Sequence, residues 1–96
     1  MWEQVSRLHA HHGDVPAEIR LLKLTEEVGE AAEALIGMQG GSPRKPSRSR
    51  NDLLDELSDV IITAAIAMSG IAGDVSQARD RLEQRLAAVC KRAGLP

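Results

Sequence analysis

The sequence contains no Phe, no Tyr and a single Trp, so an apolar core has to be built from Leu, Ile, Val and Ala. Its one cysteine, Cys90, excludes an internal disulfide and a zinc site made of cysteines alone. No apolar run reaches the roughly 18 residues that a membrane-spanning helix needs, and the first residues lack the apolar stretch of a secretory signal. We therefore expect a cytoplasmic protein with no membrane partner.

The charge is nearly balanced, with 12 Lys and Arg against 14 Asp and Glu and a net charge of −2. The positive excess that is typical of nucleic-acid binding is missing, so we expect no nucleic-acid partner. A length of 96 residues allows one domain, residues 1–96, and so short a chain leaves much of its surface exposed. We therefore expect homo-oligomerisation, in which a second copy completes the core.

The sequence pattern predicts an all-α fold, a four-helix antiparallel bundle. Branched residues do not alternate with polar ones, and no Asn-Gly or Asp-Gly turn occurs, which disfavours hairpins. The loop between the second and third helices is predicted at residues 40–50, which are rich in Gly, Pro and basic residues. The first helix is expected from about Trp2 to His11, and the second from a cap at Asp14 or Val15 to about Met38. The third is expected from a cap at Asn51 or Asp52 to about Ser69. After a break at Gly70 and Gly73, the fourth is expected from a cap at Asp74 to about Arg92.

Apolar residues at spacings of three and four predict the inward face of each helix. The third helix is apolar on nearly every side from Val60 to Met68, which predicts burial all round and therefore a subunit contact. The inward residues expected elsewhere are Val5 and Leu8 in the first helix, Leu21, Leu24, Val28, Ala31, Ala32 and Leu35 in the second, and Val75, Ala78, Leu82, Leu86 and Val89 or Cys90 in the fourth.

Two acidic pairs flank the apolar faces of the two central helices. Glu27 and Glu30 are spaced i, i+3 in the second helix, and Glu56 and Asp59 have the same spacing in the third. At 3.6 residues per turn, the members of each pair lie about 60° apart on the helix. If the two helices are antiparallel neighbours, four carboxylates come together on one side of the bundle.

Four neighbouring carboxylates repel each other unless cations are present. Oxygen ligands at this charge density favour a hard divalent ion, Mg²⁺ or Mn²⁺, over zinc. Acidic pairs on solvated helix surfaces are also common, and that interpretation stays open. Two features favour the metal site. The pairs lie beside the apolar faces rather than opposite them, and like charges at this spacing destabilise a helix.

At these residues the sequence resembles the MazG-like family of all-α nucleotide pyrophosphohydrolases. The family pattern is Glu-x-x-Glu, a loop, and then Glu-x-x-Asp. Here the first half is Glu27-Val28-Gly29-Glu30 within KLTEEVGEAAEA, and the second is Glu56-Leu57-Ser58-Asp59 within DELSDVIITA. The resemblance spans roughly residues 2–68 and weakens in the fourth helix.

The resemblance implies a Mg²⁺-dependent reaction, with Mn²⁺ as a substitute, in which water converts a nucleoside triphosphate or its deoxy form to the monophosphate and pyrophosphate. It implies that the metal ligands and catalytic residues are Glu27, Glu30, Glu56 and Asp59. A carboxylate among Glu26, Glu27 and Glu30 would accept the proton of the water. A homodimer or dimer of dimers and a house-cleaning role on non-canonical nucleotides follow by family analogy.

Substrate-binding candidates are Lys23, Trp2 and the basic residues Arg44 and Lys45. Lys23 either holds a phosphate or offsets the charge of Glu27. The basic loop, with Arg44, Lys45, Arg48 and Arg50, either folds over a triphosphate or is a solvated linker. Trp2 either stacks on the nucleobase, as the resemblance implies, or packs against the bundle.

Two other functions stay open. The size, the Lys-Leu-x-Glu-Glu run and the second acidic motif are similar to phosphoribosyl-ATP pyrophosphatase of histidine biosynthesis, although Ile61, Ile62 and Thr63 stand where those enzymes usually carry a Tyr and often a His. The other alternative is a non-catalytic helical module that binds a protein partner through its third helix. Such a module would release no pyrophosphate and gain no stability from Mg²⁺.

Overall fold

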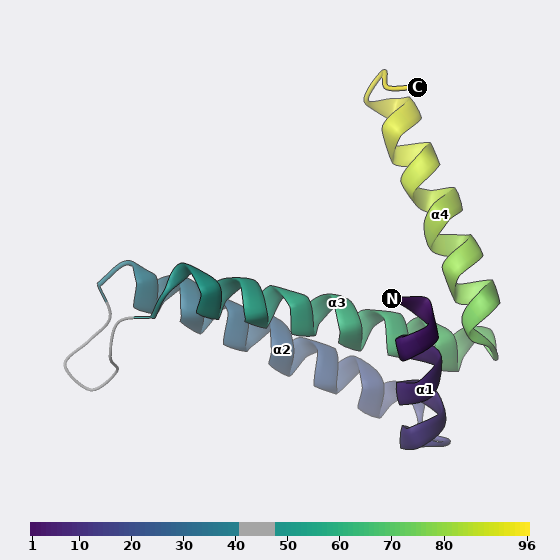
Figure 1. The fold of residues 1–96 in the computed structure, drawn as a ribbon, viewed down its shortest axis with the longest axis horizontal. Coiled ribbons are helices and arrows are strands. Elements are labelled where there is room, and N and C mark those ends of the chain that lie inside the picture. The colour runs from purple at the N-terminus through teal and green to yellow at the C-terminus, as the bar shows by residue number, and fades with distance from the viewer. Residues whose placement is uncertain (41–47) are drawn as a thin grey trace.

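The computed structural model describes residues 1–40 and 48–96, and over these residues the chain is all-helical. Four helices follow one another along the chain (Figure 1): α1 (Trp2–His12), α2 (Ala17–Met38), α3 (Arg50–Ala72) and α4 (Val75–Arg92). The predicted helix order is confirmed, and α3 is the helix whose bounds differ most, because it runs past Ser69 and Gly70. The expected cap of α2 at Asp14 or Val15 is wrong, because Pro16 stands at that position.

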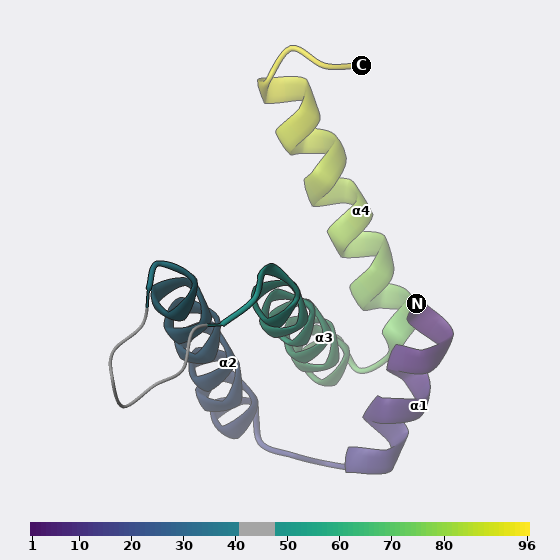
Figure 2. The same ribbon diagram turned by 60° about the vertical axis from the view of Figure 1, so that its left-hand side comes forward.

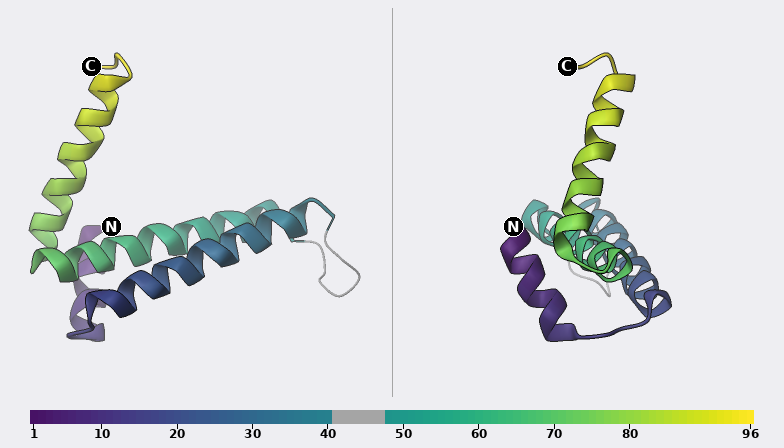
Figure 3. Two further views of the ribbon diagram at one scale, coloured as in Figure 1. Left: turned by 180° about the vertical axis from the view of Figure 1, so that it is seen from behind. Right: turned by 90° about the vertical axis from the view of Figure 1, so that its right-hand side faces the viewer.

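The centre of the fold is the antiparallel pair of α2 and α3, which lie side by side along most of their length (Figures 1 and 3). On α2 the buried apolar residues are small, namely Ala31, Ala34 and Gly37. They recur every three residues and so share one face. Small side chains let the two helix backbones approach closely, and this brings the polar residues beside them within reach of α3.

A second contact joins α1 to the far end of this pair. Val5 of α1 is buried against Ala65 and Ile66 of α3, and Trp2 packs on the same cluster. Arg20 of α2 secures the corner, since its side chain is buried and its Nη2 donates to the carbonyl oxygen of Gly13 at 3.0 Å. A Cβ at Gly70 would lie 3.1 Å from Arg20 Nε, so glycine there leaves room for the guanidinium.

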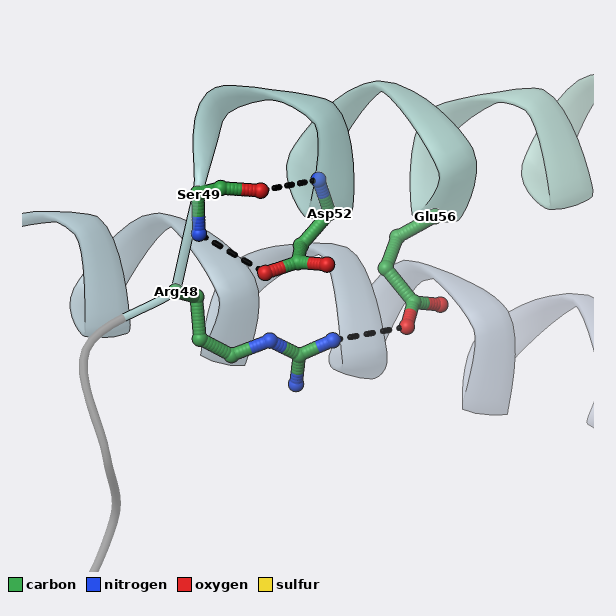
Figure 4. A network of polar contacts seen from close by, with 4 residues as sticks. All are labelled: Arg48, Ser49, Asp52 and Glu56. Atoms are coloured by element: carbon green, nitrogen blue, oxygen red, sulfur yellow. Dashed lines mark hydrogen bonds and ion pairs between the residues drawn. The ribbon is translucent and has the colours of Figure 1, made fainter.

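Side chains cap the two later helices. The hydroxyl of Ser49 accepts from the backbone N–H of Asp52, and the carboxylate of Asp52 accepts from the N–H of Ser49 (Figure 4). The prediction of a cap at Asn51 or Asp52 is therefore wrong, because this reciprocal pair makes Ser49 the cap. Asp74 caps α4 as predicted, and Gly73, at φ +94°, ends α3. Gly70 continues the helix instead of breaking it.

α4 leaves α3 at a bend of 115° and extends away from the other helices (Figures 1 and 2). Within the part of the chain that the structure describes, no single helix is both long and apolar enough to cross a membrane, and only α3 and α4 taken together across this bend meet that test.

The predicted inward faces are therefore only partly buried. Ala78 is buried on α4, whereas Leu82, Leu86 and Val89 are exposed, because none of the other helices that the structure describes covers this length of α4. On α2 the face toward α3 carries the small residues, which leaves Leu21, Val28 and Leu35 exposed. The prediction that these long apolar side chains point inward is wrong for the single chain, as it is for Leu8 of α1. Ile61 and Ile62 of α3 are also exposed, and their burial against a second copy stays a prediction.

Candidate metal centre

Three of the four predicted acidic residues meet between α2 and α3. Carboxylate oxygens of Glu27, Glu30 and Glu56 all lie within 4.8 Å of one another. Glu27 is buried in the contact between the helices, Glu56 is half-buried and Glu30 is exposed. The group therefore has a buried base and an open side, which is the arrangement that a cation site with access to substrate requires.

Two cations sit at opposite edges of this group. Lys23, one turn before Glu27 on α2, places its Nζ 3.0 Å from Glu27 Oε1 and 3.7 Å from Glu26 Oε2. Arg48, just before α3, places its Nη2 3.0 Å from Glu56 Oε1 (Figure 4). Lys23 thus contacts one oxygen of Glu27, and Arg48 contacts one oxygen of Glu56, so the second oxygen of each of these carboxylates lies outside the ion pairs.

Those second oxygens are the most informative atoms of the site. Glu27 Oε2 and Glu56 Oε2 are both buried and have no hydrogen-bond partner among the described residues. The side chain of Glu27 is only 9% exposed, so water does not readily replace a missing partner. A buried carboxylate oxygen without a donor is costly. A divalent cation would satisfy both oxygens at once, and the all-oxygen donor set fits Mg²⁺ or Mn²⁺.

The electrostatics of the group agree with its geometry. The pKa of Glu30 is raised, first by the negative charge of Glu27, then by desolvation, and then by the charge of Glu56 and a hydrogen bond with that side chain. The pKa of Lys23 is raised as well, chiefly by its hydrogen bond to Glu27 and by the charge of that residue. The group thus carries more negative charge than its two cations offset.

Asp59 lies outside this group of three. It is exposed on α3, one turn after Glu56, and its side chain is one methylene shorter than that of glutamate. Its role as a fourth ligand stays a prediction.

The substrate-binding candidates fall at different places. Lys23 forms an ion pair with Glu27, which agrees with the interpretation that it offsets the charge of Glu27. Trp2 packs on the Val5 cluster at the other end of the α2–α3 pair, which favours a packing role. Arg44 and Lys45 lie outside the described residues.

Arg48 belongs to the basic loop that was expected either to fold over a triphosphate or to be a solvated linker, and its contact with Glu56 was not predicted. This contact depends on the path of the chain into α3. One signal was available, since the Ser-x-x-Asp spacing of Ser49 and Asp52 is typical of a helix start and would have placed Arg48 at the beginning of α3. Arg20 was also missed, because a buried arginine has no periodic signature.

Comparisons with known proteins do not assign the chain to a family. No family model matches it, and neither a curated protein nor a solved structure does so. The likeness to MazG-like enzymes therefore stays a prediction from the two acidic motifs.

Proposed function

We propose that this protein is a Mg²⁺-dependent nucleotide pyrophosphohydrolase. Water would attack a nucleoside triphosphate, the anhydride bond between the α- and β-phosphates would break, and monophosphate and pyrophosphate would leave. The observation that carries the proposal is the meeting of Glu27, Glu30 and Glu56 from two helices, with two buried carboxylate oxygens that have no partner within residues 1–40 and 48–96. The order of the two acidic motifs along the chain supports it.

In this proposal the ion is held by Glu27, Glu30 and Glu56, with Asp59 as the fourth ligand that the motif implies. When bound, Mg²⁺ supplies Lewis-acid stabilisation of the negative charge on the phosphates. The carboxylates of α2 provide the proton acceptor for water, and Glu26, Glu27 and Glu30 are the candidates. Lys23 orients Glu27 through its 3.0 Å contact.

The deciding experiment is pyrophosphate release from a panel of canonical and modified nucleoside triphosphates and phosphoribosyl-ATP, with Mg²⁺ and with EDTA. We expect metal-dependent release, and the best substrate separates a general pyrophosphohydrolase from phosphoribosyl-ATP pyrophosphatase. Glu56→Gln should abolish release, whereas the exposed Glu83→Gln on α4 should not change it. No release from any compound, in a folded protein that Mg²⁺ does not stabilise, would favour the non-catalytic helical module.

We further propose that the protein acts as a homodimer or a dimer of dimers. Leu82, Leu86 and Val89 form an apolar stripe on α4 at spacings of four and three, and Leu86 is 61% exposed. Covering such residues releases water from apolar surface, which favours association. A second copy of the chain carries the same stripe on its own α4, so the two stripes can pack against each other.

A further inference from the structure

Arg48 occupies an unusual position at the rim of the acidic group. Its backbone N–H donates to the carbonyl oxygen of Gly37 at 3.2 Å, and its side-chain stem lies directly on Gly37. From there the guanidinium reaches Glu56 (Figure 4). The side chain is 34% exposed, so a cation that is anchored at both ends still faces solvent.

Gly37 is what makes this placement possible. A Cβ at Gly37 would stand 2.5 Å from Arg48 Cγ and 3.0 Å from Arg48 Cβ, distances that the near end of a side chain does not tolerate. Gly37 is buried within α2, where glycine is a poor helix former. Glycine at position 37 therefore leaves room for Arg48, although it lowers the helix propensity of α2.

The contact between Arg48 and Glu56 leaves hydrogen-bond donors of the guanidinium and one oxygen of the carboxylate available for other ligands. A guanidinium has five N–H donors, and the described residues give one of them a side-chain acceptor, Glu56 Oε1. The other oxygen of Glu56 is the buried Oε2, for which the described part of the chain offers no partner. A cation bound at Glu27 and Glu56 would draw on the charge of Glu56, and the attraction between Glu56 and Arg48 would weaken.

The charge balance indicates which ligand Arg48 would then meet. Lys23 and Arg48 offset two of the three carboxylates, so a divalent ion would change the net charge of this group from −1 to +1, or from −2 to zero when Asp59 is counted. The negative charge that would repel a polyanion is thereby removed. Arginine recognises phosphate oxygens through two parallel N–H bonds.

We propose that Arg48 is a substrate-binding residue that moves from Glu56 to the terminal phosphates of the nucleotide once the metal is bound. The inference rests on the proposed function and adds to it a binding residue outside the acidic motifs. Arg48 lies beside Glu56, which is a metal ligand in the proposed function. The metal and the guanidinium would therefore hold different phosphate groups, so the site would select a polyphosphate chain rather than a monophosphate ester.

The test compares three variants by steady-state kinetics at saturating Mg²⁺. Arg48→Gln should raise KM for the triphosphate about tenfold or more and leave the Mg²⁺-induced rise in melting temperature intact. Arg85→Gln removes an exposed arginine of α4 and should leave KM unchanged. Gly37→Ala keeps the positive charge but displaces the Arg48 stem, so it should raise KM with helix content retained by circular dichroism.

Two outcomes would overturn the role of Arg48 while leaving the hydrolase intact: an unchanged KM in Arg48→Gln, or an equal rise in Arg48→Gln and Arg85→Gln. Calorimetric binding of inorganic tripolyphosphate with Mg²⁺ separates this inference from the proposed function. Binding that is lost in Arg48→Gln, in a protein that hydrolyses nothing, would uphold the polyphosphate site and exclude the hydrolase. Absence of binding to the wild-type protein would overturn the site itself.

Discussion

The guanidinium of Arg20 donates a 3.0 Å hydrogen bond to the carbonyl oxygen of Gly13, the residue that ends α1. Arg20 is 8% exposed, so the bond forms in a buried corner where α1, α2 and α3 meet. We expect Arg20→Ala to lower the free energy of unfolding by about 2 kcal/mol, through the lost charged hydrogen bond and the lost packing of the stem. Urea denaturation at fixed protein concentration measures this effect, and Arg85→Ala on the exposed surface of α4 is the control.

The repulsion within the acidic group gives a second prediction. Glu30→Gln removes one negative charge beside Glu27 and Glu56, so the melting temperature in EDTA should rise. The rise that Mg²⁺ produces in the wild-type protein should be lost, because a ligand that binds the folded state stabilises it only while its site exists. Differential scanning fluorimetry with and without Mg²⁺ gives both values. A variant that retains the full Mg²⁺ response would remove Glu30 from the site.

Asp59 provides a test of the fourth ligand. Its carboxylate lies outside the group formed by Glu27, Glu30 and Glu56, so Asp59→Asn should keep the stabilisation by Mg²⁺ in the absence of nucleotide. Turnover should nevertheless fall, by about 100-fold, if Asp59 completes the ligand set when substrate binds. Asp55→Asn, an exposed change in the preceding turn of α3, serves as the control. Full activity in Asp59→Asn would restrict the site to the three glutamates.

The apolar stripe of α4 predicts the effect of a charge at its centre. Leu86→Glu should convert the oligomer to a smaller species in analytical ultracentrifugation, because an ionised carboxylate is costly to bury in an interface. Gln84→Glu adds the same charge on the opposite face of α4 and should leave the sedimentation unchanged. A wild-type protein that sediments as a monomer at micromolar concentration would contradict the proposed assembly.

The cap of α4 gives a pH-dependent prediction. Hydrogen bonds from the backbone N–H and side chain of Gln77 lower the pKa of Asp74 in the folded protein. A lowered pKa means that Asp74 stabilises the fold above its unfolded pKa of about 3.9 and that this contribution is lost as pH falls through the folded value. Asp74→Ala should therefore lower the melting temperature at neutral pH, and the difference from wild type should shrink steadily below about pH 4. A difference that is constant with pH would exclude the ionised cap.

The sequence predicted the parts of the structure that depend on local spacing. The i, i+3 pairs and the antiparallel order of α2 and α3 bring Glu27, Glu30 and Glu56 together as expected. The bounds of α1 and the cap of α4 followed from the same local rules.

Features that depend on tertiary context were not predictable in this way. Leu86 has the periodicity of a buried residue, and whether it is buried depends on a surface that the single chain does not supply. Arg48 reaches Glu56 because Gly37, eleven positions earlier, leaves space for its stem. Neither relationship is encoded in a run of neighbouring residues.

The lone indole of the chain has a practical consequence. Trp2 packs where α1 meets α3, and the sequence has no tyrosine to add a second emitter. Intrinsic fluorescence therefore reports on the seating of α1 alone, and its emission should shift to the red when α1 detaches. Comparing that signal with far-ultraviolet dichroism, which is dominated by the three longer helices, would reveal whether the amino-terminal helix melts with the rest of the molecule or ahead of it.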